Sequence, residues 1–154
     1  MKINYTEILN KNMINVFKDV LLNIEKNGLQ EGHHLYITFD TKNLKVVIAK
    51  WLKEKYPAKM TIVIQNEYWN FEVKKNHFNI ILSFDDIKTN LEVPFDSVIS
   101  FADPYANFGL QLIQEIIESE KTQIEKVIEK KKDENKDNNI INFNKYKKKL
   151  NKKL

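Results

Sequence analysis

The chain has 154 residues, 42% of them hydrophobic, with nine Phe and six Tyr, which is enough for one domain with its own core. It contains no cysteine, which excludes disulfides, thiol nucleophiles and cysteine-based metal sites. The formal net charge is +4, and all 25 basic residues are lysine, so the arginine that usually reads guanine and phosphate is missing.

The positive charge is concentrated at the C-terminal end. Residues 1–113 hold 13 Lys and 13 acidic residues, whereas residues 114–154 hold 12 Lys and 8 acidic residues. The N-terminal segment MKINYTEILNKNM lacks the apolar core of a signal peptide, and no apolar run approaches the ~18 residues of a membrane span. We therefore predict a cytoplasmic protein with a neutral domain and a basic tail.

Residues 4–27 are predicted to form a helix. Asn4 is the expected N-cap, and the pair Asn27-Gly28 is a typical helix stop. Apolar residues recur every three or four positions, which gives one wide face. This face consists of Ile8, Leu9, Met13, Val16, Phe17, Val20, Leu21 and Ile24.

Short strands are predicted to follow the helix. Alternating or β-branched segments occupy 35–39, 46–48, 60–65, 69–73, 78–84, 87–93, a part of 95–101, and 108–112, with a short helix within 49–55. Strands at this spacing predict an α+β fold that is mostly β, with a helix before a small antiparallel sandwich or open barrel. With only three Gly in the chain, Asn and Asp must adopt most of the turn conformations.

The stretch from Tyr56 to Phe71, YPAKMTIVIQNEYWNF, joins two kinds of surface. Its apolar run 60–64 is typical of a strand buried on both faces. The polar and aromatic residues that follow, 65–69, suggest the floor of a binding groove in which amides hydrogen-bond a peptide. The alternative is a strand end and hairpin whose aromatic rings only close the core.

The composition changes beyond Leu112. Residues 114–139 are predicted to be a linker, with a partly helical start and a polar, disordered stretch at 130–139. Apolar residues return in IINFNKY (140–146) and are followed by three lysines. Such a cluster cannot fold alone, so residues 140–154 are predicted to be a flexible docking tail.

No group of residues predicts an enzyme, a metal site or a cofactor. His33 and His34 are adjacent at the start of a strand, so their side chains point to opposite faces and do not share a metal. Asp85-Asp86 is best explained as a hairpin turn. Glycine-rich phosphate loops and activated serine motifs are absent from the sequence.

Several motifs, in this order and spacing, resemble the stringent starvation protein B family in its alphaproteobacterial form. They are GHHLYITFDT (32–41), YP (56–57), MTIVIQ (60–65), YW (68–69), LSF (82–84), VPF (93–95), FADP (101–104) and FGLQ (108–111). The resemblance covers roughly residues 5–112. At one turn where members of the family usually have Gly-Gly, this chain has Asp85-Asp86.

The resemblance implies a dimeric adaptor that binds ssrA degradation tags and carries tagged proteins to the ClpXP protease. It implies a tag groove formed by Gln65, Asn66, Glu67, Tyr68, Trp69, Leu82, Ser83 and Phe84. It implies docking to the N-terminal domain of ClpX by Ile140, Ile141, Phe143, Tyr146 and Lys147. It also implies a homodimer formed through the first helix, for which the candidates are Leu9, Met13, Val16, Phe17 and Val20.

A second hypothesis is a small nucleic-acid-binding β-barrel with a basic arm, because such barrels also have short strands. A neutral domain without arginine argues against it. Nucleic acid is therefore the less favoured partner, and steep salt dependence of binding would distinguish this hypothesis from the adaptor.

Overall fold

The computed structural model describes residues 1–112 and Ile128. The predicted docking tail, and the predicted linker apart from Ile128, lie outside the described residues. The fold below is therefore that of residues 1–112.

Helix α1 spans Tyr5–Asn27 and begins and ends where the sequence predicts. The Asn4 side-chain oxygen accepts a hydrogen bond of 3.1 Å from the backbone N–H of Glu7, which caps the first turn. At the other end Gly28 has φ 75°, and its N–H donates to the Ile24 carbonyl at 2.8 Å. A left-handed φ of this kind is accessible to glycine without steric cost, so the helix stops there.

The inner face of α1 belongs to the core of its own chain. Met13, Phe17, Leu21 and Ile24 are buried. The Phe17 ring lies 4.8 Å from that of Phe101 and about 6 Å from those of Phe78 and Phe95, measured between centroids. This aromatic cluster ties the helix to both sheets.

Replacing Phe17 by leucine should therefore lower the free energy of unfolding by about 1–2 kcal/mol, because the ring edges lose their partners and a small cavity is left. The urea midpoint by circular dichroism measures the loss. Leu22→Ala is the matched control on the same helix, because Leu22 is exposed. Equal midpoints for the two variants would contradict the central role of the cluster.

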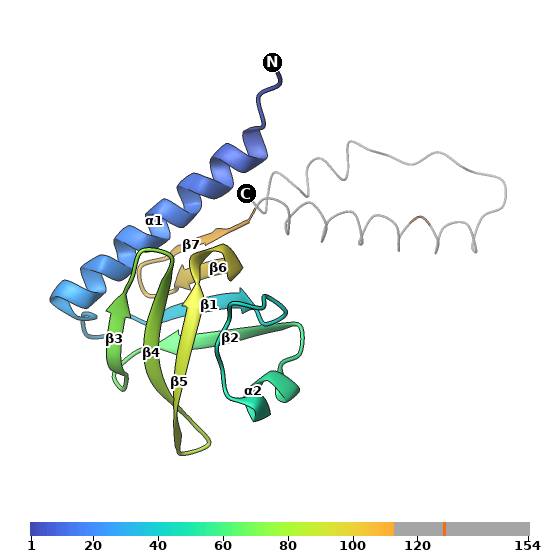
Figure 1. The fold of residues 1–154 in the computed structure, drawn as a ribbon. Coiled ribbons are helices and arrows are strands. Elements are labelled where there is room, and N and C mark those ends of the chain that lie inside the picture. Colours follow the sequence, from blue (N-terminus) through green and yellow to red (C-terminus); the bar gives the residue numbers. More distant parts are fainter. Residues whose placement is uncertain (113–127, 129–154) are drawn as a thin grey trace. The chain divides into compact units, whose positions relative to one another are not determined.

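Seven strands form two antiparallel sheets, with α1 along one side (Figure 1). The first sheet has the order β2-β1-β6-β7, and the second has the order β3-β4-β5. Their bounds are β1 Leu35–Asp40, β2 Lys59–Ile64, β3 Trp69–Val73, β4 His77–Phe84, β5 Ile87–Pro94, β6 Val98–Asp103 and β7 Phe108–Gln111. A short helix α2, Lys50–Lys55, and a 3-10 turn η1, Phe95–Ser97, complete the domain. The predicted α+β fold with a small sandwich is confirmed.

Acidic and amide residues make the tight turns. Phe84 pairs with Ile87, so Asp85 and Asp86 form a two-residue hairpin loop with φ 50° and 64°. Asn107, in the turn between β6 and β7, and Asn70, at the irregular start of β3, also have positive φ. A two-residue hairpin of type I′ needs left-handed backbone at both loop positions, and Asp and Asn tolerate it better than other non-glycine residues. The prediction that these residues replace glycine is confirmed.

Two strand predictions are wrong. Strand β2 is not buried on both faces: Met60, Ile62 and Ile64 are buried, while Thr61 is exposed and Val63 is half-buried. The reason is that its sheet covers the core with one face only. The predicted strand 46–48 is reduced to a single bridge between Val47 and Glu92.

Candidate functional site: a groove between the two sheets

A groove of about 580 Å³ lies where β2 of the first sheet approaches the end of β4 in the second. It brings together six of the eight predicted tag-binding residues, from two segments far apart in the sequence. Its lining consists of Tyr56, Thr61, Ile62, Val63, Gln65, Asn66, Glu67, Leu82, Ser83 and Phe84.

Backbone edges border this groove on two sides. Among the strands of residues 1–112, β2 is the last of its sheet and pairs only with β1. Strand β3 begins opposite Ile81, so the final residues of β4, Leu82–Phe84, extend beyond it. Strand edges without a neighbouring strand offer N–H and C=O groups to an added extended chain. The groove can therefore bind a peptide through main-chain hydrogen bonds.

The side chains in the groove divide into an apolar floor and a polar rim. Leu82 is 4% exposed and Phe84 and Tyr56 are half-buried. Gln65, Asn66 and Glu67 are exposed, and no hydrogen bond joins the Gln65 or Asn66 amides to another described residue. Free amides beside an apolar floor can bind both the backbone and the side chains of a peptide.

Tyr68 and Trp69, the other two predicted residues, do not line the groove. The Tyr68 ring packs edge-on against Phe71 with centroids 6.0 Å apart. Trp69 pairs with Ile81 across the second sheet, and the Lys88 ammonium lies 4.1 Å from its ring centroid. These two aromatic residues support the strand next to the groove.

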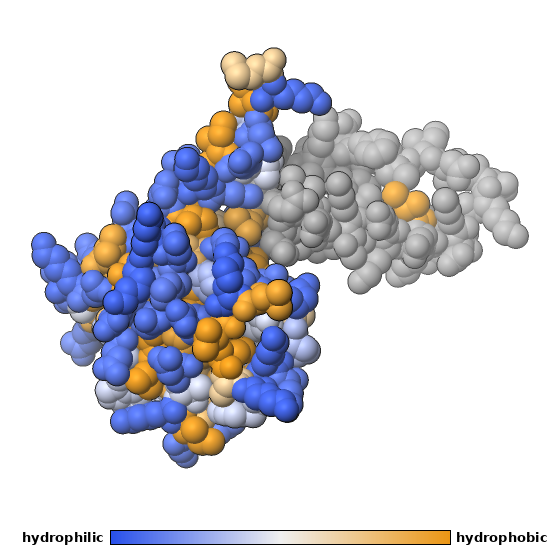
Figure 2. All heavy atoms as spheres, in the orientation of Figure 1, coloured by the Kyte–Doolittle hydropathy of each residue, from blue (hydrophilic) through white to orange (hydrophobic). Residues whose placement is uncertain are grey.

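The predicted dimer residues lie on different sides of α1. Met13 and Phe17 are buried within their own chain. Leu9 and Val16 are 55% and 39% exposed, which leaves them free for contact with another molecule. Val16 and the half-buried Val20 line a second cleft of about 780 Å³, between the C-terminal half of α1 and strands β1, β6 and β7. On the face shown in Figure 2, apolar side chains reach the surface near the N-terminal end of α1.

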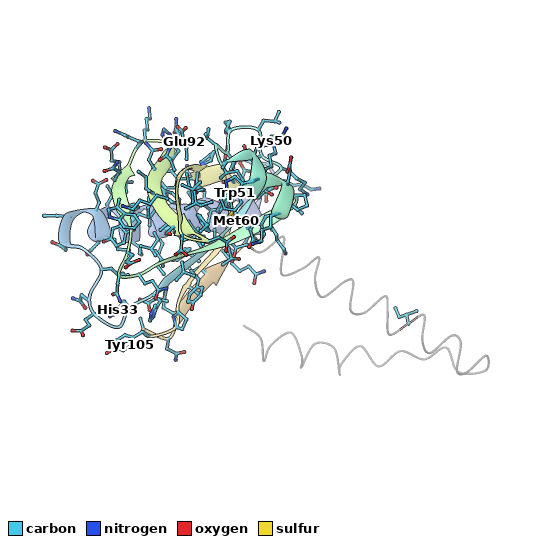
Figure 3. The ribbon with its side chains drawn as sticks, turned by 90° about the horizontal axis from the view of Figure 1, so that it is seen from below. His33, Lys50, Trp51, Met60, Glu92 and Tyr105 are labelled. Atoms are coloured by element: carbon cyan, nitrogen blue, oxygen red, sulfur yellow. The ribbon has the colours of Figure 1, made fainter. Side chains whose placement is uncertain are left out.

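His33 connects the loop after α1 to the β6–β7 hairpin, a link that the sequence did not reveal. Its Nδ1 lies 2.6 Å from the Asp103 carboxylate, and its ring lies 4.7 Å from that of Tyr105 (Figure 3). Burial raises the pKa of Asp103, but hydrogen bonds from His33 and from the backbone N–H groups of Ala106 and Tyr105, with the charge of His33, outweigh it. The pKa of Asp103 therefore lies below its ordinary value of 3.8.

Asp103→Asn should lower stability by about 1 kcal/mol near neutral pH, because a charge-assisted hydrogen bond is lost. A lowered folded-state pKa means that the stabilisation by Asp103 is fully present above 3.8 and declines as the pH falls toward the folded-state value. Urea midpoints of the variant and the parent protein should therefore converge in acid. A difference that does not depend on pH would contradict this explanation.

Residues 1–112 and Ile128 contain no cluster of three or more His, Asp or Glu side chains placed to hold a metal ion. Over the same residues, no helix combines the length and the apolar character needed to cross a bilayer.

The model of the SspB family, stringent starvation protein B, matches residues 8–153. No curated protein matches the chain. Because the family match spans nearly the whole chain, and the fold is the one the motifs imply, the protein belongs to the stringent starvation protein B family, a family of adaptors for the ClpXP protease.

Proposed function

We propose that this protein binds ssrA-type degradation tags and tethers the tagged proteins to ClpXP. The observation that carries the proposal is the groove between β2 and β4. Segments 65–67 and 82–84, which the family resemblance assigned to the tag, both line it. The alphaproteobacterial subtype and the cytoplasmic location remain predictions.

The groove suggests how a tag would bind. An extended peptide would add to the free edge of β2 or of the β4 end, and its small side chains would contact Leu82 and Phe84. Gln65 and Asn66 would hydrogen-bond its polar groups. Glu67 is the one charged residue of the lining, so binding should depend little on salt.

The delivery part of the proposal concerns residues outside the described range. If residues 114–139 behave as a random coil, their end-to-end distance is about 28 Å, from ~5.5 Å times the square root of the residue number. Such a linker gives an effective substrate concentration on the order of mM at the protease. Residues 140–154 would supply the contact with ClpX, through Ile140, Ile141, Phe143, Tyr146 and Lys147.

A homodimer would have two tag grooves and two docking tails. Tyr5, Ile8, Leu9 and Val16 are exposed apolar residues of α1 at helical spacing, and they form a stripe that a second copy can cover. Two tails on one particle would add avidity to weak individual contacts.

The direct test is fluorescence anisotropy with a labelled ssrA-type peptide and the full chain. We expect saturable binding with a dissociation constant on the order of micromolar or tighter. The affinity should change little between low and high salt. A scrambled peptide of the same composition is the control. Equal binding of both peptides, or no saturation, would refute tag recognition.

A further inference from the structure

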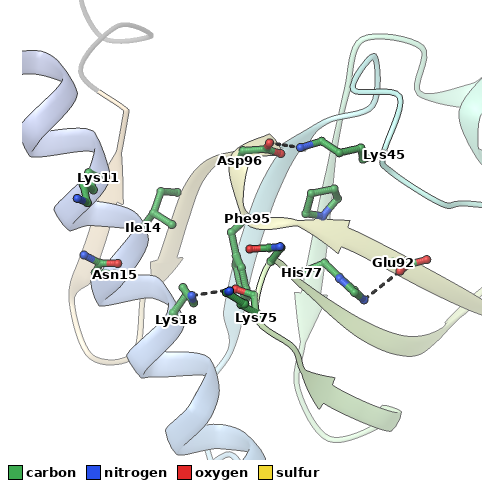
Figure 4. A pocket seen from close by; sticks show the side chains of 12 residues that line it. Lys11, Ile14, Asn15, Lys18, Lys45, Lys75, His77, Glu92, Phe95 and Asp96 are labelled. Atoms are coloured by element: carbon green, nitrogen blue, oxygen red, sulfur yellow. Dashed lines mark hydrogen bonds and ion pairs between the residues drawn. The ribbon is translucent and has the colours of Figure 1, made fainter.

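A third cleft, of about 640 Å³, lies between α1 and the β4–β5 sheet, apart from the tag groove (Figure 4). One wall is the side of α1, and the other consists of the turn before β4 together with the end of β5 and η1. Its lining is Lys11, Ile14, Asn15, Lys18, Lys45, Lys75, Asn76, His77, Glu92, Pro94, Phe95 and Asp96.

This cleft carries an excess of positive charge. Four lysines face two carboxylates, although residues 1–113 as a whole are neutral. Both carboxylates already have partners: Asp96 forms an ion pair with Lys45, and Glu92 lies 2.9 Å from the His77 ring nitrogen. The ammonium groups of Lys11 and Lys75 are exposed and have no partner among the described residues. The charge left over in the cleft is therefore cationic.

One of the lysines is held in place over an apolar floor. The Lys18 ammonium donates to the Lys75 carbonyl at 2.9 Å and lies 5.1 Å from the centroid of the Phe95 ring. Phe95 is 4% exposed, and Pro94 and Ile14 continue the apolar surface beside it. A ligand would thus meet a cationic rim and a small apolar base.

We propose that this cleft binds an acidic, extended peptide segment with an aliphatic side chain among its carboxylates. Lys11 and Lys18 are seven residues apart on one side of α1, or about 10 Å along the helix. An extended chain covers the same distance in about three residues. Carboxylates spaced along a peptide can therefore reach both ammonium groups, while its aliphatic side chain contacts Pro94 and Phe95.

The same observations disfavour the other anionic ligands. A single phosphate is too compact to reach lysines spread over this distance, and lysine does not provide the bidentate contact by which arginine recognises phosphate. Nucleic-acid bases need an exposed aromatic surface to stack on. The one aromatic ring other than His77 in the lining is Phe95, which is buried and has Lys18 over it.

The test uses the full chain and a fluorescein-labelled peptide Glu-Glu-Leu-Glu-Glu, with Gln-Gln-Leu-Gln-Gln as the uncharged probe. The double variant Lys11→Gln/Lys75→Gln removes the two unpaired charges. Lys50→Gln/Lys53→Gln is the matched control, because both residues are exposed on α2, outside the cleft, and the net charge changes equally. The basic tail is the same in all proteins, so its contribution cancels in the comparison.

We expect the cleft variant to weaken binding of the acidic peptide by roughly three- to tenfold and the control to leave it within about twofold. Amide signals of residues 11–18, 75–77, 92, 93, 95 and 96 should shift on titration. Ser83→Trp, which blocks the tag groove, should leave this binding unchanged, so this proposal and tag recognition can fail separately. Equal effects of the two lysine double variants, or shifts confined to residues 113–154, would overturn it. Preferential binding of an oligothymidylate that depends on Lys11 and Lys75 would also overturn it, in favour of nucleic acid.

Discussion

Ser83→Trp should weaken the binding of an ssrA-type peptide by at least about a hundredfold, equivalent to roughly 2.7 kcal/mol. Ser83 is exposed, lines the groove, and lies on β4 directly opposite Lys88 of β5. An indole at this position would occupy space that the peptide needs, next to the Leu82 and Phe84 floor. Anisotropy with the labelled peptide measures the loss.

The matched control is Asn90→Trp. Asn90 is exposed on β5 and does not line the groove, so an indole there should leave peptide affinity within about twofold. Urea midpoints should show that both variants remain folded. These positions test the groove more directly than Tyr68, whose ring packs on Phe71 and whose removal would also disturb the fold. If Ser83→Trp bound the tag normally, the peptide would have to bind elsewhere.

Removing residues 140–154 should abolish the acceleration of ClpXP degradation while leaving tag affinity within about twofold. The proposed mechanism gives the physical reason: if the groove and the tail are separate contacts joined by a linker, the effective concentration at the protease disappears with the tail contact. The measurement is the rate at which ClpXP degrades a tagged fluorescent protein, at a substrate concentration well below saturation.

Two controls distinguish the proposed docking contact of the tail from a nonspecific effect of its positive charge. Replacing Lys147, Lys148 and Lys149 by glutamine keeps the apolar residues 140–146 and removes three charges. It should reduce delivery less than the full deletion does, because in the proposed contact the apolar residues would be the buried part. The adaptor protein added to an untagged substrate should have no effect. Undiminished delivery by the shortened chain would exclude the proposed role of the tail.

Local sequence signals were sufficient to predict most of the fold. Asn4 and Gly28 marked both ends of α1, since capping and left-handed stops are local effects. The alternation of apolar and polar residues predicted β1 and β4, and Asp85-Asp86 predicted the hairpin turn between β4 and β5. The exposed face of β2 was missed because the position of a strand in its sheet depends on contacts distant in the sequence.

The sites were less predictable than the fold. Residues 65–67 and 82–84 line one groove although β2 and β4 belong to different sheets, a proximity that family resemblance indicated and spacing alone did not. The pairing of His33 with Asp103 and the four lysines of the third cleft had no local signal, apart from the seven-residue spacing of Lys11 and Lys18. These residues are distant in the sequence and come together only through tertiary packing.

The burial of Phe17 and Leu21 within a single chain has a consequence for assembly. In the homodimer proposed above, each protomer would have its complete core before it met another, so the subunits could separate on dilution and recombine without losing their structure. Mixed particles, with one intact and one altered subunit, should therefore form by simple exchange. In such particles the contribution of a single arm or a single groove can be measured.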